Sequence, residues 1–286
     1  MLIDIFGQSH ETKEMRDYCN YYGLPSFDEA NHIYGFFNSS REQIFGHLIS
    51  LKNVNPRGTV IVVHGYQSHS GDQKNVVKKY LAENKMVALL DFQGHGLSTG
   101  KEVYIKDFKE YVKTLEIFMF YGSMFFKGKI EFFGHSQGCA ILSMYARNRK
   151  DLNLTYFAPL VRLKHPMLVE FISYMPIKNI FMKANVSSNK EYNRFANKDK
   201  LQSKIVSRQW LRATVKFCKE FMDYEGYDPS IKLFVVQGCK DVVVDYSFNI
   251  AVLGTKFRQV TVNLIDEANH QLQNESEEIR KAVFSF

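Results

Sequence analysis

The sequence predicts an α/β domain, built on a mostly parallel β-sheet that is flanked by helices. Two observations lead to this class. Short runs of β-branched and aromatic residues alternate with amphipathic stretches along the chain. Several of these runs are almost continuously apolar, as buried parallel strands are. The 286 residues, 45% of them hydrophobic, suffice for one large domain with a sizeable core and an insertion.

The expected strands follow the apolar runs, at residues 43–51, 59–63, 86–91, 130–133, 154–157, 232–236 and 259–264. The expected helices follow the amphipathic stretches, at about 72–83, 105–121, 137–148, 247–254 and 275–284. Strands and helices therefore alternate along most of the chain, which is the order that parallel pairing requires.

The interval between the strands at 154–157 and 232–236 is far longer than a crossover connection needs. We interpret the excess as a helical cap inserted over the site after the strand near Leu154. The chain then divides into a core of residues 1–158 and 227–286 and a cap of residues 159–226. The cap is rich in Phe, Tyr, Met and Lys, and about half of its aromatic side chains are expected to bury it against the core.

The net charge of +7 is concentrated in this cap. Between Leu160 and Glu220 there are 13 Lys and Arg residues and 4 acidic residues, so this segment carries +9 and the remainder carries −2. Such asymmetry indicates a surface that meets anionic lipid or an anionic substrate. Nucleic acid is not an expected partner, because the usual recognition motifs are absent from the sequence.

The chain is expected to be cytoplasmic, with peripheral contact at the inner membrane surface. It has no apolar run of about 18 residues, and its first residues meet Asp4 too early for a signal peptide. The four cysteines have neither C-x-x-C nor metal-type spacing, and we expect them to be reduced and to act as small buried hydrophobes.

The pentapeptide Gly134-His135-Ser136-Gln137-Gly138 lies between a predicted strand and a predicted helix. This is the G-x-S-x-G pattern of a nucleophile elbow in its required context. The turn leaves no room for a Cβ two residues before or after the serine. It lifts Ser136 Oγ toward substrate and places the Gln137 N–H at a helix N-terminus, where it can meet a developing oxyanion.

A nucleophilic serine needs a base to accept its proton. In chains with such an elbow, the acid and then the histidine follow the serine. His165 and His270 are the only histidines that follow Ser136 in this sequence. His165 precedes a proline in the predicted cap, whereas His270 follows the strand at 259–264 on a polar loop. We therefore predict that His270 is the base.

The serine, the base and an acid that orients the base form a catalytic triad. The acid is predicted to be Asp241, just past the carboxyl end of the strand at 232–236. Asp245 is better placed to cap the next helix, and Asp266 in the histidine loop is the weaker rival. We expect the second oxyanion donor to be the N–H of Tyr66, after His64-Gly65. His64 and His69 lack a third ligand at a sensible spacing, so no metal is expected there.

These motifs together resemble the monoglyceride lipase and lysophospholipase branch of the serine α/β-hydrolases, from about Ile61 to His270. The matching stretches are His64-Gly65 with Ser68-His69-Ser70, Asp91 to Gly100, Gly134 to Gly138, Ala158 to Val161, Asp199 to Gln202 with Trp210, Gly238 to Asp241, and His270. In that family a small residue usually follows His-Gly, where this chain has Tyr66.

The resemblance implies an α/β-hydrolase fold and ester hydrolysis through an acyl-serine on Ser136, with neither a metal nor an organic cofactor. The expected substrate is a monoacylglycerol or a lysophospholipid, with His64, Gly65, His135 and Trp210 lying against it. A small-ester carboxylesterase or a serine aminopeptidase of the same superfamily is the alternative, although an aminopeptidase would want acidic cap residues. A non-catalytic hydrolase-like binding protein would lack a triad member, and none is missing.

Overall fold

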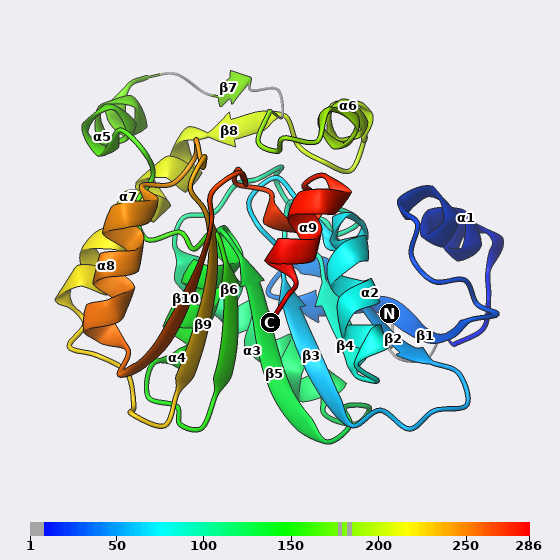
Figure 1. The fold of residues 1–286 in the computed structure, drawn as a ribbon. Coiled ribbons are helices and arrows are strands. Elements are labelled where there is room, and N and C mark those ends of the chain that lie inside the picture. Colours follow the sequence, from blue (N-terminus) through cyan, green and yellow to red (C-terminus); the bar gives the residue numbers. More distant parts are fainter. Residues whose placement is uncertain (1–8, 177–178, 182–184) are drawn as a thin grey trace.

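The central element is an eight-stranded sheet with the strand order β1-β2-β4-β3-β5-β6-β9-β10 (Figure 1). The computed structural model describes residues 9–176, 179–181 and 185–286. The strands are β1 (Ala30–Ser39), β2 (Glu42–Leu51), β3 (Gly58–Val63), β4 (Met86–Leu90), β5 (Lys129–His135), β6 (Asn153–Phe157), β9 (Lys232–Gly238) and β10 (Gln259–Ile265). β1 and β2 pair antiparallel, as do β2 and β4, and the remaining pairs are parallel.

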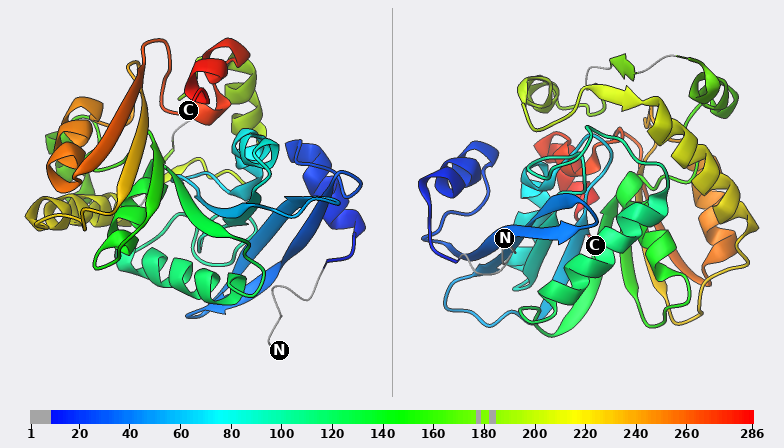
Figure 2. Two further views of the ribbon diagram at one scale, coloured as in Figure 1. Left: turned by 60° about the horizontal axis from the view of Figure 1, so that its bottom comes forward. Right: turned by 180° about the vertical axis from the view of Figure 1, so that it is seen from behind.

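Helices cover both faces of the sheet (Figure 2). The helices outside the β6–β9 connection are α1 (Lys13–Tyr22), α2 (Lys74–Ala82), α3 (Phe108–Gly122), α4 (Gln137–Ala146), α8 (Tyr246–Lys256) and α9 (Glu277–Val283). Successive side chains of β3 point to opposite faces of the sheet, so the core consists of two clusters. Ile61 and Val63 pack in the cluster with α3, α4 and α8. Val60 and Val62 pack in the cluster with α1, α2 and α9.

The segment between β6 and β9, called here the insertion, arches over one end of the sheet (Figure 1). Its elements are α5 (Pro166–Tyr174), β7 (Asn179–Phe181), α6 (Lys190–Lys198), β8 (Ile205–Ser207) and α7 (Arg208–Asp223). β7 and β8 form a separate antiparallel pair. Phe217 and Phe221 of α7 belong to the core cluster with α3 and α4, so the insertion shares its packing with the sheet domain.

The predicted α/β class and the mostly parallel sheet are confirmed. Each expected strand and helix is present, with ends shifted by a few residues. Two elements of the amino-terminal region were not predicted, α1 and the edge strand β1. Within the described residues, no helix has the length and apolar character that crossing a bilayer requires.

Candidate active site

Ser136 lies at the turn between β5 and α4, in a backbone conformation that non-glycine residues rarely adopt. Its φ is 51° and its ψ is −112°. The flanking glycines are required by close backbone contacts. A Cβ on Gly138 would lie 2.0 Å from the Val63 carbonyl oxygen, and one on Gly134 would lie 2.9 Å from the Cys139 nitrogen. The sequence argument for a crowded strand-turn-helix junction therefore holds in three dimensions.

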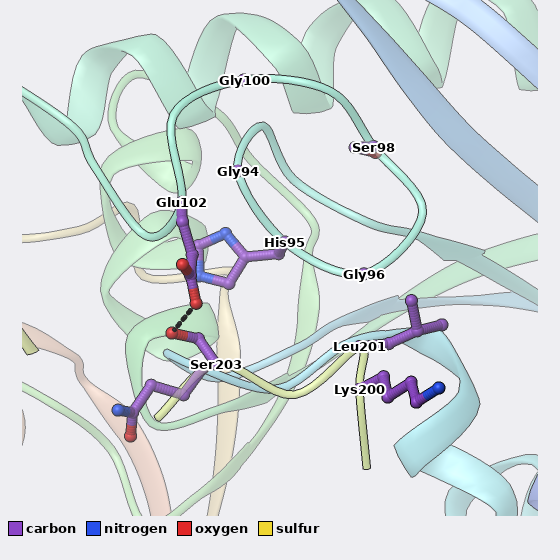
Figure 3. A pocket seen from close by; sticks show the side chains of 10 residues that line it. Gly94, His95, Gly96, Ser98, Gly100, Glu102, Lys200, Leu201 and Ser203 are labelled. Atoms are coloured by element: carbon purple, nitrogen blue, oxygen red, sulfur yellow. Dashed lines mark hydrogen bonds between the residues drawn. The ribbon is translucent and has the colours of Figure 1, made fainter. Parts of the chain in front are cut away.

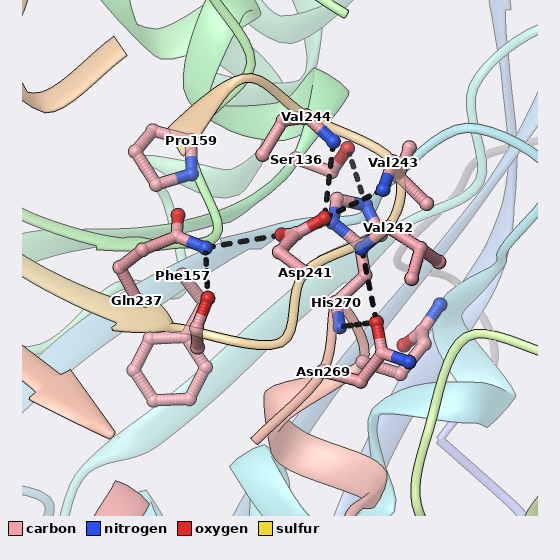
Figure 4. Close-up of polar contacts among 12 residues, drawn as sticks. Ser136, Phe157, Pro159, Gln237, Asp241, Val242, Val243, Val244, Asn269 and His270 are labelled. Atoms are coloured by element: carbon pink, nitrogen blue, oxygen red, sulfur yellow. Dashed lines mark hydrogen bonds and ion pairs between the residues drawn. The ribbon is translucent and has the colours of Figure 1, made fainter. Parts of the chain in front are cut away.

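Three side chains from the carboxyl-terminal ends of three strands form one hydrogen-bonded series (Figure 4). His270 Nε2 lies 3.0 Å from Ser136 Oγ, and His270 Nδ1 lies 2.8 Å from Asp241 Oδ2. Ser136 and His270 are 5% exposed and Asp241 is 1% exposed. In this arrangement His270 can take the serine proton at Nε2 while Asp241 holds Nδ1–H and offsets the charge that develops on the ring.

Asp241 is held as a carboxylate by several donors. Its Oδ1 accepts the N–H groups of Val243 and Val244 at 2.8 and 3.0 Å, and its Oδ2 accepts Gln237 Nε2–H at 3.1 Å. Burial raises the pKa of this carboxyl, but the charge and hydrogen bond of His270 together with the two N–H groups outweigh burial and hold the pKa at about 2. The rival Asp266 lies elsewhere, with its Oδ1 3.6 Å from Cys239 Sγ.

The N–H groups of Tyr66 and Gln137 have no acceptor among the described hydrogen bonds, and the Trp210 side chain contacts both residues. The Trp210 ring stacks on Tyr66 with centroids 3.7 Å apart at 17°, and its Nε1 donates to the Gln137 side-chain oxygen. The Tyr66 hydroxyl also accepts the Ser207 N–H at 2.8 Å and donates to the Val103 carbonyl at 3.3 Å. The insertion thus supports the two residues expected to bind an oxyanion.

His64, Gly65 and His135 are buried, the first two directly after β3 and the third at the end of β5. His64 Nε2 accepts the Phe92 N–H at 3.1 Å and Nδ1 donates to the Gly65 carbonyl at 2.8 Å, while burial lowers the His64 pKa to about 4. A Cβ on Gly65 would lie 2.6 Å from His135 Nδ1, and His135 Nε2 donates to the His270 carbonyl at 3.0 Å. These contacts give the three residues a supporting position, and their contact with substrate stays a prediction.

A buried ion pair joins the insertion to the loop after Tyr66. His69 Nε2 lies 3.0 Å from Asp199 Oδ2, and Asp199 Oδ1 accepts the Tyr22 hydroxyl at 2.7 Å. Burial lowers the pKa of His69, but the hydrogen bond to Asp199 and the charges of Asp91 and Asp199 outweigh burial and raise it. No spacing in the sequence indicates this pair, since its members are 130 positions apart.

Beside this pair is a polar cavity of about 190 Å³, lined by Gln67, Gly94, His95, Gly96, Ser98, Gly100, Glu102, Lys200, Leu201 and Ser203 (Figure 3). Ser203 Oγ donates to Glu102 across it at 2.7 Å. Ser136 and His270 do not line this cavity, and the His95 pKa is lowered to about 3 by burial and the nearby His64. His95 is therefore uncharged, and it is not part of the hydrogen-bonded series of Ser136, His270 and Asp241.

Comparison with known families decides the classification. A family model described as serine aminopeptidase, S33, matches residues 54–277. The chain belongs to this family. The matched span contains Ser136, Asp241 and His270, so the hydrogen-bonded series lies wholly inside the region that defines the serine aminopeptidase S33 family.

Two relatives in sequence carry lipase names. The chain is 39% identical over 61 residues to a monoacylglycerol lipase of Mycolicibacterium smegmatis, a match that covers 21% of this chain and 22% of that enzyme. It is 23% identical over 247 residues to a monoglyceride lipase homolog of Monkeypox virus, which covers 80% of this chain and 87% of the viral protein. The more identical match thus spans about a fifth of its relative's length.

Solved structures share the fold. A monoacylglycerol lipase of Paleococcus ferrophilus superposes with a TM-score of 0.70 at 16% identity, covering 85% of this chain and 97% of that one. A soluble variant of the Saccharomyces cerevisiae monoglyceride lipase superposes with a TM-score of 0.75 at 16% identity, covering 88% and 92%. The predicted resemblance to the monoglyceride lipase branch of the α/β-hydrolases is confirmed.

Proposed function

We propose that the chain is a serine hydrolase that cleaves carboxylic esters of single-chain lipids, monoacylglycerols or lysophospholipids. The observation that carries the proposal is the series from Ser136 Oγ through His270 to Asp241, with both steps within 3.0 Å. The lipase names of the relatives favour a lipid ester over other acyl compounds.

The reaction proceeds through an acyl-serine. Ser136 Oγ attacks the ester carbonyl carbon while its proton passes to His270 Nε2, and the N–H groups of Tyr66 and Gln137 face the oxyanion that forms. His270 then gives the proton to the leaving alcohol oxygen as the carbon–oxygen bond breaks. Water repeats the sequence on the acyl-serine, releasing the fatty acid and restoring the Ser136 hydroxyl.

The family description raises the alternative of an aminopeptidase, which needs a free acidic group to hold the substrate amine. Three of the four acidic residues between Leu160 and Glu220 already have partners: Glu170 pairs with Lys219, Asp199 with His69, and Glu220 with Lys216. This pairing favours the ester substrate. We also propose that the insertion is a cap that covers the acyl chain of this substrate.

A labelling experiment tests the nucleophile. A fluorophosphonate probe is expected to react with the native chain at Ser136, located by peptide mass spectrometry, and Ser136→Ala is expected to lose both labelling and hydrolysis while keeping its far-ultraviolet circular dichroism. A panel of 1-oleoylglycerol, lysophosphatidylcholine, p-nitrophenyl butyrate and leucine p-nitroanilide tests the substrate class. Turnover of the anilide above the lipid esters would overturn the lipid assignment.

We also propose that the insertion docks on anionic membrane surfaces. Five apolar side chains within the basic segment between Leu160 and Glu220 are 55–86% exposed: Met167, Leu168, Phe171 and Tyr174 of α5 and Phe181 of β7. Tyr192, Trp210 and Phe217 of the same segment are buried and do not contribute to this exposed face. Lys178 and Lys183 lie outside the described residues.

Vesicle co-sedimentation tests the docking, with phosphatidylserine against phosphatidylcholine at low and high salt. Binding to the anionic vesicles is expected to fall with salt, because salt screens the attraction. Phe171→Ser is expected to weaken binding, whereas Phe120→Ser, at an exposed position of α3, is the matched control. Equal binding to both vesicle types would contradict the proposed electrostatic attraction between the insertion and anionic lipid. The cytoplasmic location stays a prediction.

A further inference from the structure

Three side chains with the chemistry of zinc ligands meet between α1 and the β1–β2 hairpin. These elements contribute nothing to the Ser136 series, and they are labelled in Figure 1. Cys19 lies on α1, His32 on β1 and His47 on β2. One ligand atom of each lies within 4.8 Å of the others, and each residue is 1% exposed or less. Of the described part of the chain, this is the one group of three such residues close enough to share an ion.

The geometry of the two histidines is close to that of a metal site. His32 Nδ1 lies 2.9 Å from His47 Nε2. A tetrahedral zinc ion with Zn–N bonds of about 2.0–2.1 Å would hold these nitrogens about 3.3 Å apart. The rings therefore need to separate by only about 0.4 Å to admit the ion.

Contacts around the histidines orient His32 in the way that a ligand needs. Its Nε2 lies 3.4 Å from the Ser26 carbonyl oxygen and its ring stacks on Phe27 with centroids 4.3 Å apart. Donation of Nε2–H to a carbonyl leaves a lone pair on Nδ1, which is how a ligating imidazole is usually fixed. His47 Nδ1 has no hydrogen-bond partner among the described residues, so no contact at that atom fixes which ring nitrogen of His47 carries the proton.

Binding an ion would change where the protons of this cluster lie. Zinc takes an imidazole through a nitrogen lone pair and a cysteine as the thiolate. Binding therefore requires Cys19 to release its proton and His47 to carry its ring proton on Nδ1, so that Nε2 is free for the ion.

We propose that Cys19, His32 and His47 bind one zinc ion, which fastens α1 to the edge of the sheet. The ion would join three elements, of which α1 in turn supports the loop after Tyr66. Tyr18 shares a hydrogen bond of 3.0 Å with Ser70, and the Tyr22 hydroxyl donates to Asp199 at 2.7 Å. The sequence did not indicate the site, since its three ligands come from separate elements with no motif spacing.

Metal analysis of the full chain tests the site. The chain is purified with zinc, freed of loosely bound ions and measured by inductively coupled plasma mass spectrometry. About one zinc per chain is expected, and Cys19→Ser and His47→Ala are each expected to weaken binding by more than the roughly 10–100-fold that loss of a ligand's hydrogen-bond partner costs. Cys218→Ser, a half-buried cysteine of α7, is the matched control and is expected to keep the ion.

Cobalt substitution separates ligand loss from misfolding. Co²⁺ in the native chain is expected to show tetrahedral d–d bands and a thiolate charge-transfer band, and Cys19→Ser is expected to lose the charge-transfer band while circular dichroism shows a folded chain. Affinity should rise with pH, because binding releases the Cys19 proton. Less than a tenth of a zinc per chain, or full binding by Cys19→Ser, would overturn the proposal. Neither result depends on hydrolysis at Ser136.

Discussion

Replacing Asp241 by Asn tests the catalytic series most directly, because the change keeps the shape of the side chain. An Asn oxygen in place of Oδ1 keeps both backbone N–H bonds, from Val243 at 2.8 Å and Val244 at 3.0 Å. The Asn NH₂ group then takes the place of Oδ2, which lies 2.8 Å from His270 Nδ1. It donates to Nδ1, so the ring proton moves to Nε2 and faces Ser136 Oγ. A ring in that tautomer cannot accept the serine proton.

The expected loss follows from known serine hydrolases. The wrong tautomer lowers kcat about 10⁴-fold in the Ser-His-Asp proteases, which corresponds to about 5 kcal/mol of transition-state stabilisation. The free energy of unfolding should fall by about 1.5–3 kcal/mol, because Gln237 loses its bond to a charged acceptor.

The assay measures kcat with a p-nitrophenyl ester at neutral pH, and urea unfolding measures stability. Asp266→Asn is the matched control, in the loop before His270, and is expected to keep near-native kcat. A Asp241→Asn variant within tenfold of native kcat, or a control that loses activity as steeply, would refute the assignment of the acid.

Three further changes have distinct expected outcomes. Gly138→Ala places a Cβ 2.0 Å from the carbonyl oxygen at the end of β3, so the free energy of unfolding should fall by at least about 3 kcal/mol; Gly254→Ala, with no atom within 4 Å, should raise it by about 0.5–1 kcal/mol in the same urea titration. Tyr66→Phe loses the bond to the Ser207 N–H and should cost about 1–3 kcal/mol, with kcat changed less than tenfold because the backbone donor remains; a loss as large as that of Asp241→Asn would contradict this. The Asp241 pKa is lowered from 3.8 to about 2, so its contribution of about 2 kcal/mol is complete above about pH 4 and is lost as the pH falls to about 2; the stability gap between native chain and Asp241→Asn should shrink over that interval.

The part of the site that the sequence could predict is the part fixed by local crowding. Gly134, Ser136 and Gly138 follow from one backbone turn, and the predicted strand and helix on either side place that turn at the end of β5. His270 and Asp241 could be chosen because few residues of the right type follow the serine. Roles assigned in this way rest on chain order alone, and the structure adds the distances that join them.

The amino-terminal elements could not be predicted, because tertiary contacts stabilise them more than their own sequence does. β1 carries Asn31, His32 and Asn38 within ten residues, which obscures the alternation of a strand. Its ten-residue pairing with β2 supplies the missing stability. α1 is polar overall and buries only Met15, Cys19 and Tyr22, at helical spacing that is too brief to identify a helix from sequence.

Tyr66 stands where the resembled family usually has a small residue, and the structure shows what its bulky side chain contacts. A small residue at this position would leave the Trp210 ring without its stacking partner and the Ser207 N–H without its acceptor. Since Trp210 also holds the Gln137 side chain, one residue of α7 contacts both expected oxyanion donors. A displacement of α7 would therefore disturb both donors at once. In the proposed mechanism, the position of α7 would therefore affect both groups that face the oxyanion.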